Sequence, residues 1–94
     1  MLKTLFATAL AAVAMIATSA SAQDYPSKPI KLIVPYGAGG GTDYTGRVIA
    51  GLLEEELGQP VNVVNRSGAI GLVGHTAIAQ AKPDGYTLGV VTFE

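Results

Sequence analysis

The sequence has no cysteine, no tryptophan and only one histidine among its 94 residues. Without cysteine the chain can form no disulfide and can hold no metal through a thiolate, and it offers no thiol for a lipid anchor. A single histidine without clustered carboxylates does not make a metal site either. We therefore expect no metal site in this chain.

Excess positive charge is also lacking. Six Lys and Arg residues face seven Asp and Glu residues, for a net charge of −1, and the basic residues do not cluster. Nucleic-acid binding, which requires neutralisation of a phosphate backbone, is therefore disfavoured. The acidic run Glu54–Glu56 is most simply the solvated edge of a helix.

The one long hydrophobic run lies at the start of the chain. Lys3 gives a positive start, an alanine-rich apolar stretch runs from Leu5 to Ala17, and Ala20–Ala22 supplies small residues of the A-x-A type. The pattern predicts a cleavable signal peptide over residues 1–22, cut after Ala22, because the run is too short and too rich in alanine for a membrane anchor. We expect no membrane span after cleavage. Residues 23–94 make at most one small domain, so either its core suffices without disulfides or the rest of the protein is missing.

The first half of the mature segment reads as strand, glycine loop and helix. Ile30–Val34 is a short, nearly continuous apolar run, typical of a strand covered on both faces. After the loop, Thr42 is the expected N-cap, Asp43 suits the first helical turn, and Gly58 with Pro60 ends the helix. The apolar residues at helical spacing, which predict its buried stripe, are Val48, Ile49, Leu52, Leu53 and Leu57.

The second half repeats this alternation. Residues 61–64 predict a second strand, and a helix over about 72–81 is expected to bury Val73, Ala77 and Ile78. The Lys-Pro-Asp-Gly turn at 82–85 leads to a third strand over 86–92. The order βαβαβ predicts an α/β fold with right-handed crossovers, a parallel sheet and helices against its faces.

The glycine loop is the main chemical signal. Four of the five positions from Gly37 to Gly41 are glycine, and the loop follows the carboxyl end of a strand, where open α/β sheets bind ligands. A dinucleotide site would need a third glycine or alanine where Thr42 stands, and a phosphate loop would need a lysine. Two interpretations remain, a small anion held by main-chain N–H groups, which we favour, and a tight turn that merely packs.

Catalytic signatures are sparse. Ser67, His75 and Asp84 are the only candidates for a hydrolytic triad, but the residues around Ser67 do not form a nucleophile elbow. We expect His75 to have a structural or cleft-lining role, and we assign no catalytic residue.

Six blocks of residues then occur in one order and spacing: Tyr25–Ile30, Ile33–Tyr36, Gly39–Asp43, Leu57–Val61, Asn65-Arg66 and Pro83–Leu88. Together they closely resemble the start of the periplasmic solute receptors of tripartite tricarboxylate transporters, the Bug receptors. The resemblance extends over the whole mature segment.

This resemblance implies that residues 23–94 form the N-terminal, incomplete part of the first lobe of a type II periplasmic-binding-protein fold. Such receptors are periplasmic, capture small carboxylates such as di- and tricarboxylates, and present them to membrane permease subunits. They are not enzymes and use no cofactor. The family's ligand-binding role is carried over to these residues: Tyr36, Ala38, Gly39, Gly40, Gly41, Thr42, Asp43, Gly68, Ala69 and Gly71.

Some positions depart from the family pattern. The family often has prolines at Gly37 and Ala38 and an asparagine at Leu72, which suggests a less rigid loop and an altered pocket here. Asp43 would repel an anion unless it caps the helix or meets a cationic group. Family members are several times longer, so we expect this sequence to be a truncated or partial coding sequence. The alternative is an exported α/β enzyme, a hydrolase or nucleotide-dependent enzyme, whose catalytic residues lie beyond Glu94.

Overall fold

The computed structural model describes residues 2–9 and 24–93. Residues 2–9 are helical, but most of the predicted signal peptide, including the cleavage site after Ala22, lies outside the described residues. Within the described ranges, no helix is both long enough and apolar enough to cross a membrane.

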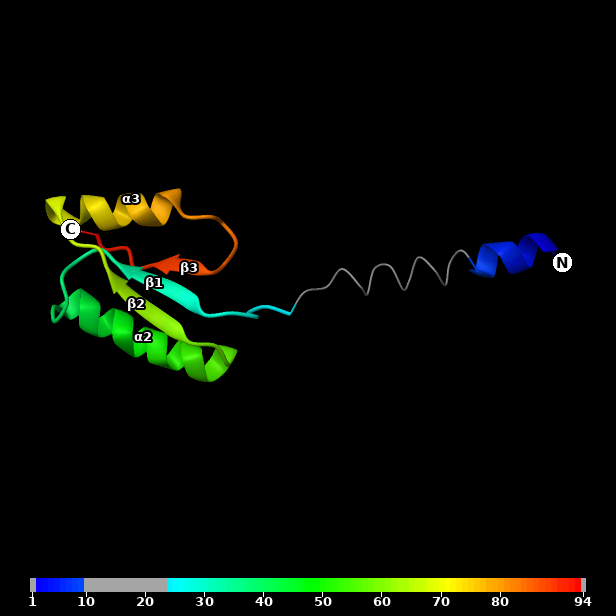
Figure 1. Cartoon of the computed structure of the whole chain (residues 1–94), viewed down its shortest axis with the longest axis horizontal. Coiled ribbons are helices and arrows are strands. Elements are labelled where there is room, and N and C mark those ends of the chain that lie inside the picture. Colours follow the sequence, from blue (N-terminus) through cyan, green and yellow to red (C-terminus); the bar gives the residue numbers. More distant parts are fainter. Residues whose placement is uncertain (1, 10–23, 94) are drawn as a thin grey trace.

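The centre of the fold is a parallel sheet of three strands, β1 (Ile30–Val34), β2 (Val61–Asn65) and β3 (Thr87–Gly89), in the order β2-β1-β3 (Figure 1). The predicted parallel βαβαβ arrangement is therefore confirmed. β3 is shorter than the predicted 86–92. Its ladder continues at both ends, because Lys31 N–H donates to the Tyr86 carbonyl and Val90 N–H donates to the Ile33 carbonyl.

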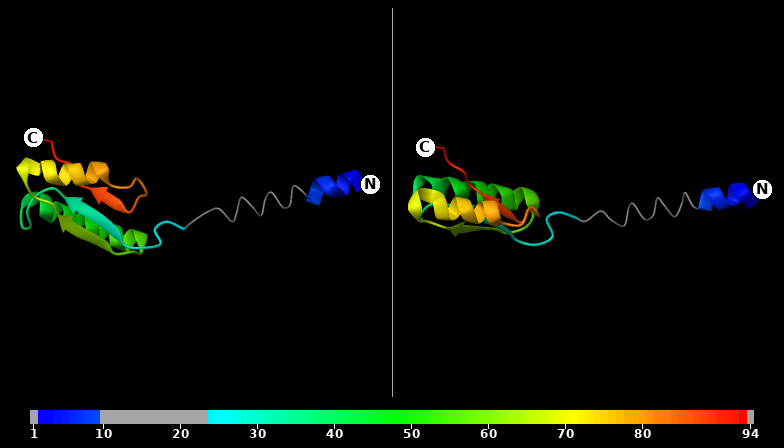
Figure 2. Two further views of the ribbon diagram at one scale, coloured as in Figure 1. Left: turned by 45° about the horizontal axis from the view of Figure 1, so that its top comes forward. Right: turned by 90° about the horizontal axis from the view of Figure 1, so that it is seen from above.

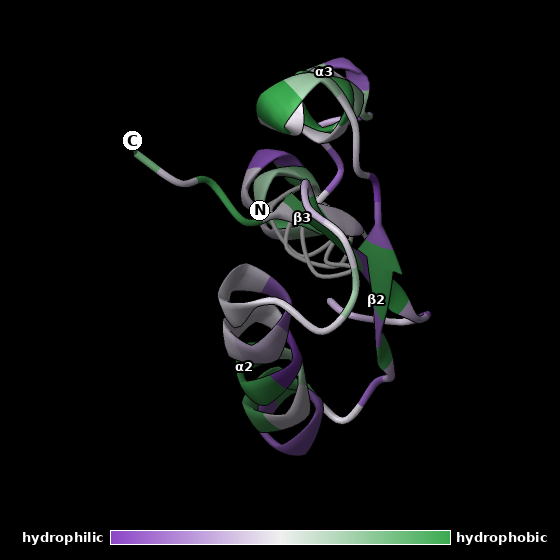
Figure 3. Cartoon of the chain, turned by 90° about the vertical axis from the view of Figure 1, so that its left-hand side faces the viewer, coloured by the Kyte–Doolittle hydropathy of each residue, from purple (hydrophilic) through white to green (hydrophobic). Residues whose placement is uncertain are grey.

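Two helices cover the sheet on opposite faces. α2 (Gly41–Leu57) connects β1 to β2, and the short helix η1 (Ala69–Gly71) with α3 (Leu72–Gln80) connects β2 to β3. The first connection runs to one side of β1 and the second returns to the other. Right-handed crossovers therefore place the helices on different faces, as the two views of Figure 2 and the view along the strands in Figure 3 show.

The apolar core lies between α2 and the sheet. Ile30, Leu32 and Val61 are buried there against Ala50. The contact face of α2 differs from the predicted stripe, because Val48, Ile49 and Leu52 are 46%, 43% and 58% exposed. The helix instead turns small residues toward the strands: a methyl group added at Gly46 would lie 2.8 Å from Val34 Cγ2. Leu53 and Leu57 of the predicted stripe do pack against this core. Hydrophobic periodicity was therefore right for these two residues and wrong for Val48, Ile49 and Leu52, because the helix makes its closest approach to the sheet through Gly46 and Ala50.

α3 makes its close approach through Gly74, which is buried. A methyl group added there would lie 2.4 Å from Pro35 Cα and 2.7 Å from the Arg66 carbonyl oxygen. Ala77 and Ile78 are half-buried, but Val73 is 48% exposed, so its predicted burial is wrong. Because α3 contacts the ends of the strands with the face that contains Gly74, Val73 points away from them.

The segment before β1 is held to the start of β3. The Tyr25 hydroxyl donates to the Gly85 carbonyl. Ser27 N–H donates to the Tyr86 hydroxyl at 2.9 Å, and Lys28 Nζ lies 4.5 Å from the centre of the Tyr86 ring. These contacts hold residues 25–28 beside the turn that leads into β3.

Candidate functional site

Two loops meet at the carboxyl-terminal edge of the sheet. β1 and β2 end in register, with Val34 opposite Asn65. The first loop (residues 35–40) leaves β1 and the second loop (residues 66–71) leaves β2. Arg66 N–H donates to the Val34 carbonyl at 2.8 Å, and Asn65 Nδ2 donates to the Tyr36 carbonyl at 3.1 Å. The predicted ligand-binding residues therefore come from segments that are hydrogen-bonded to each other.

The first loop ends at the N-terminus of α2. The helix starts at Gly41 with Gly40 as N-cap, and no side chain caps it. The expected N-cap Thr42 is therefore wrong, because it is already the second residue of the helix. The first intrahelical bond runs from Tyr44 N–H to the Gly40 carbonyl at 2.9 Å, so the N–H groups of the first turn have no partner within the helix.

The Asp43 carboxylate is buried and bonded on every side. It accepts hydrogen bonds from Gly39 N–H at 3.0 Å, from Asn65 Nδ2 at 2.8 Å and from Arg47 Nε at 3.0 and 3.2 Å. Arg47 also donates to Asn65 Oδ1 at 3.2 Å. Asp43 is only 4% exposed. Its cationic partner is thus Arg47, one helical turn later.

These contacts explain the ionisation of Asp43. The hydrogen bonds from Gly39 N–H, Asn65 and Arg47 lower the pKa of the Asp43 carboxyl to about 2, because donors stabilise the charged form. The carboxylate is therefore ionised throughout the neutral range. Its charge is offset by the Arg47 guanidinium, whose side chain is 53% exposed.

The second loop has an unusual backbone. Four consecutive residues, 68–71, have positive φ, and two of them, Ala69 (φ 50°) and Ile70 (φ 54°), are not glycine. The left-handed region is strained for a β-branched residue. Ile70 is nevertheless 90% exposed, so burial of its side chain does not account for the conformation.

His75 and Tyr36 connect the loops on the α3 side. His75 Nδ1 lies 2.8 Å from the Gly71 carbonyl, and the Tyr36 hydroxyl lies 2.9 Å from Thr92 Oγ1. The rings of Tyr36 and His75 meet edge to face at 6.4 Å. His75 Nε2 is buried and has no hydrogen-bond partner among residues 2–9 and 24–93. His75 thus lies beside the first loop.

An open hollow of about 510 Å³ lies where the strand order reverses, between the start of α2 and the segment after β3. Ligands in open α/β sheets bind at such a reversal, outside the carboxyl ends of the strands. Its lining residues are Gly41, Thr42, Thr45, Val90, Val91 and Thr92.

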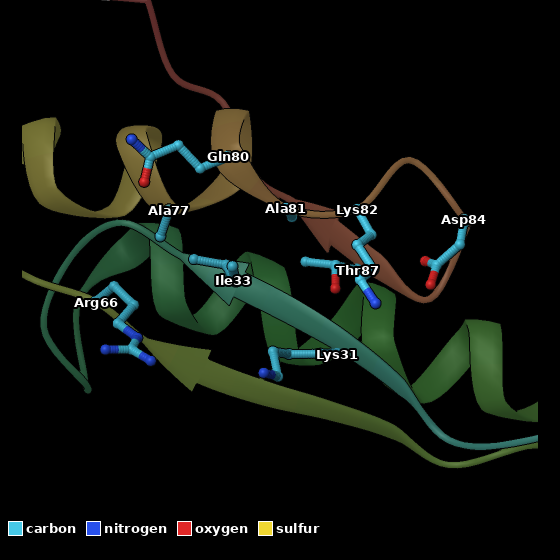
Figure 4. Close-up of a pocket in the computed structure, with 9 residues that line it drawn as sticks. All are labelled: Lys31, Ile33, Arg66, Ala77, Gln80, Ala81, Lys82, Asp84 and Thr87. Atoms are coloured by element: carbon cyan, nitrogen blue, oxygen red, sulfur yellow. The ribbon is translucent and has the colours of Figure 1, made fainter.

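Another hollow, of about 320 Å³, lies on the α3 face of the sheet rather than at its edge (Figure 4). Its charged residues are Lys31, Arg66, Lys82 and Asp84. None of the predicted ligand-binding residues lines it.

The structure brings the predicted residues of the first loop and of the first turn of α2 together with Gly68, Ala69 and Gly71 at one edge. Of these residues, only Gly41 and Thr42 line the hollow there. The assignment of ligand contacts stays a prediction. Sequence reasoning missed Arg47 and Asn65 as part of the site, although the Asp43–Arg47 spacing of four residues was a signal for an ion pair on a helix. It also missed Thr45 and the segment after β3. In the described part of the chain, no three His, Cys, Asp or Glu side chains gather in a way that could hold a metal ion.

In a comparison with protein families, residues 45–94 match the tripartite tricarboxylate transporter family receptor. Among curated proteins, the chain is similar to BugT of Bordetella pertussis, with 52% identity over 77 residues. That alignment covers 82% of this chain and 24% of BugT, so the chain spans about a quarter of the length of the curated relatives it matches.

Solved structures agree. A Rhodopseudomonas palustris protein with adipate matches with a TM-score of 0.70 and 38% identity, over 72% of this chain and 23% of that one. MatC from Rhodopseudomonas palustris with bound malate matches with a TM-score of 0.66 and 38% identity, over 69% of this chain and 22% of that one. The three-stranded α/β unit is therefore the one that these binding proteins contain.

Proposed function

Because the chain belongs to the tripartite tricarboxylate transporter receptor family, we propose that residues 24–93 form one wall of a binding site for a small carboxylate. The observation that carries the proposal is the glycine loop that leads into α2. The N–H groups of the first turn of α2 lie before Tyr44, the first residue whose N–H bonds within the helix, and so have no intrahelical partner. Such groups, together with the helix dipole, attract anions.

The surroundings support this proposal. The hollow at the strand reversal is lined on one side by Gly41 and Thr42 and on the other by Thr92, so it offers main-chain donors and hydroxyl groups to a ligand. The structural relatives described above hold adipate and malate, which are both small dicarboxylates.

We further propose that the whole protein is a periplasmic receptor that delivers its ligand to membrane permease subunits. The ligand is bound and released without chemical change, so the site acts by affinity alone. No residue of the site is assigned a catalytic role, and no cofactor is required for capture by hydrogen bonds.

A glycine substitution tests the proposal in the gene product that carries this sequence. Gly41 has open space where a methyl group would be added and does not need a positive φ. Gly41→Ala is therefore expected to fold normally while placing a methyl group beside the proposed anion. Gly51→Ala is the matched control, since Gly51 lies on the same helix, also has open space and is far from the loop.

The measurement is the melting temperature with and without a panel of carboxylates that includes malate, adipate and citrate, with their neutral amides as controls. A ligand at about 100 times its Kd stabilises the folded state by about 2.7 kcal/mol, which a thermal melt resolves. We expect a carboxylate to raise the melting temperature of the wild type and, by the same amount, of Gly51→Ala. Gly41→Ala should need a higher ligand concentration for the same rise. No rise with any carboxylate in the wild type would refute the proposal.

A further inference from the structure

The strongest unexplained feature near the site is the ion pair of Asp43 and Arg47. A negative charge this close to an anion site opposes binding, yet Asp43 is 4% exposed and lies in the first turn of α2. Its position therefore needs a reason that outweighs the repulsion.

The contacts of Asp43 supply that reason. Asp43 Oδ2 accepts a hydrogen bond from Gly39 N–H at 3.0 Å, and Asp43 Oδ1 accepts one from Asn65 Nδ2 at 2.8 Å. Asn65 Nδ2 also donates to the Tyr36 carbonyl at 3.1 Å. The carboxylate thus connects Gly39 directly to the end of β2 and, through Asn65, to Tyr36. It also occupies the Gly39 N–H, which is then not available to a ligand.

Arg47 removes the electrostatic disadvantage. Its Nε lies 3.0 Å from Asp43 Oδ2, and its side chain is half-exposed. The guanidinium cannot lose its proton in the neutral range, so the pair carries no net charge next to the site. The N–H groups of the first helical turn can then donate hydrogen bonds to an anion that is not repelled by a net negative charge at the pair.

We propose that Asp43 and Arg47 act as a charge-compensated pair of positioning residues, in which Asp43 fixes the glycine loop and Arg47 makes the loop acceptable to a carboxylate. This inference rests on the proposed function, because it describes how the same site reaches its affinity. It assigns neither side chain a direct contact with the ligand.

The test is a double-mutant cycle in the gene product that carries this sequence, with Arg47→Gln, Asp43→Asn and the double variant, and with malate and adipate as probes. Arg47→Gln leaves the Asp43 charge uncompensated. We expect the Kd to rise about threefold to tenfold at low salt and less at 0.5 M salt, because screening weakens repulsion between charges. Asp43→Asn loosens the loop but leaves the Arg47 charge uncompensated beside the anion, so we expect a loss of affinity that is larger at 0.5 M salt, where that attraction is screened.

The double variant separates charge from structure. In the double variant no charge is left at the pair, so we expect its Kd, unlike that of either single variant, to have the salt dependence of the wild type. Lys31→Gln, which removes a cation from the sheet face outside this site, is the matched control and should leave the Kd unchanged. If Asp43→Asn does not fold, the salt dependence of Arg47→Gln decides alone.

Two results would overturn the inference. One is a salt-independent loss in Arg47→Gln, and the other is a double variant whose salt dependence follows Arg47→Gln rather than the wild type, since either indicates that the pair does not act through its net charge. A wild-type protein that binds no carboxylate would instead refute the proposed function itself, and the inference with it.

Discussion

Replacement of Gly74 by alanine should displace the loops at the carboxyl-terminal edge of the sheet without altering any residue proposed to bind the ligand. Gly74 lies in α3, where the helix passes the first residues of both loops. An added methyl group would lie 2.4 Å from Pro35 Cα, 2.5 Å from Pro35 Cβ and 2.7 Å from the Arg66 carbonyl oxygen. Two of these three atoms belong to the backbone, so no side-chain rotation relieves the contact.

The magnitude follows from two opposing effects. Alanine in place of glycine within a helix contributes about 0.5–1 kcal/mol of stability. Ordinary carbon contacts need about 3.5 Å, so α3 must move away by roughly 1 Å, and overpacking of this kind costs about 1–3 kcal/mol or more. We expect a net loss of about 1–2 kcal/mol, together with weaker ligand binding because Pro35 and Arg66 begin the two loops.

Urea denaturation measures the loss. With a slope of about 2 kcal/mol per M, a 2 kcal/mol loss lowers the midpoint by about 1 M. Gly51→Ala is the control, because the same substitution in open space of α2 should raise the midpoint. If Gly74→Ala is as stable as the wild type, α3 does not press on the loop ends as described, and the reasoning is wrong.

Three further outcomes are expected. Leu32→Ala, at a site 4% exposed, should cost about 2–5 kcal/mol, whereas Leu52→Ala, at a site 58% exposed, should stay within about 0.5 kcal/mol in urea denaturation; equal losses would contradict the observed orientation of α2. The pKa of Asp43 is lowered to about 2, so its contribution to stability is present above about pH 4 and is lost as the pH falls toward 2; acid titration of wild type against Asp43→Asn should show this difference, and parallel curves would exclude it. Ile70→Gly should keep or raise thermal stability, because relief of the left-handed φ, worth about 1–2 kcal/mol, exceeds the entropic cost of glycine, about 0.5–1 kcal/mol; a clear drop in melting temperature would show that Ile70 is held by contacts.

The topology and the strands could be predicted from the sequence because they depend on local signals. The run Ile30–Val34 is apolar enough to specify a covered strand, and alternation with two helical segments leaves a parallel sheet as the simple solution. The position of the glycine loop at the carboxyl edge follows from the same order. These expectations needed no knowledge of which residues touch.

The helix orientations could be predicted only in part, since Leu53 and Leu57 pack against the core as expected but Leu52 is exposed. The details of the site could not be predicted in this way. The face of α2 that meets the sheet is chosen by close approach at Gly46, a steric property of two surfaces that periodicity does not contain. The partners of Asp43 also depend on tertiary structure, since Asn65 comes from the next strand. The ion pair with Arg47 could have been predicted from the spacing of four residues. The role of Asp43 in the loop could not, because it depends on the hydrogen bond from Gly39 N–H.

The central position of β1 has a consequence for how the chain folds. β1 is the first strand in the described part of the chain, yet its neighbour β2 follows only after α2, and its neighbour β3 only after α2, β2 and α3. Neither edge of β1 can be satisfied by a local hairpin, so each pairing must first close a long loop, and parallel pairing of this kind is slow. Until then its apolar segment is exposed in a strand-forming region that attracts other chains. Lys31 is its one charged residue, and a charge at such a position opposes self-association.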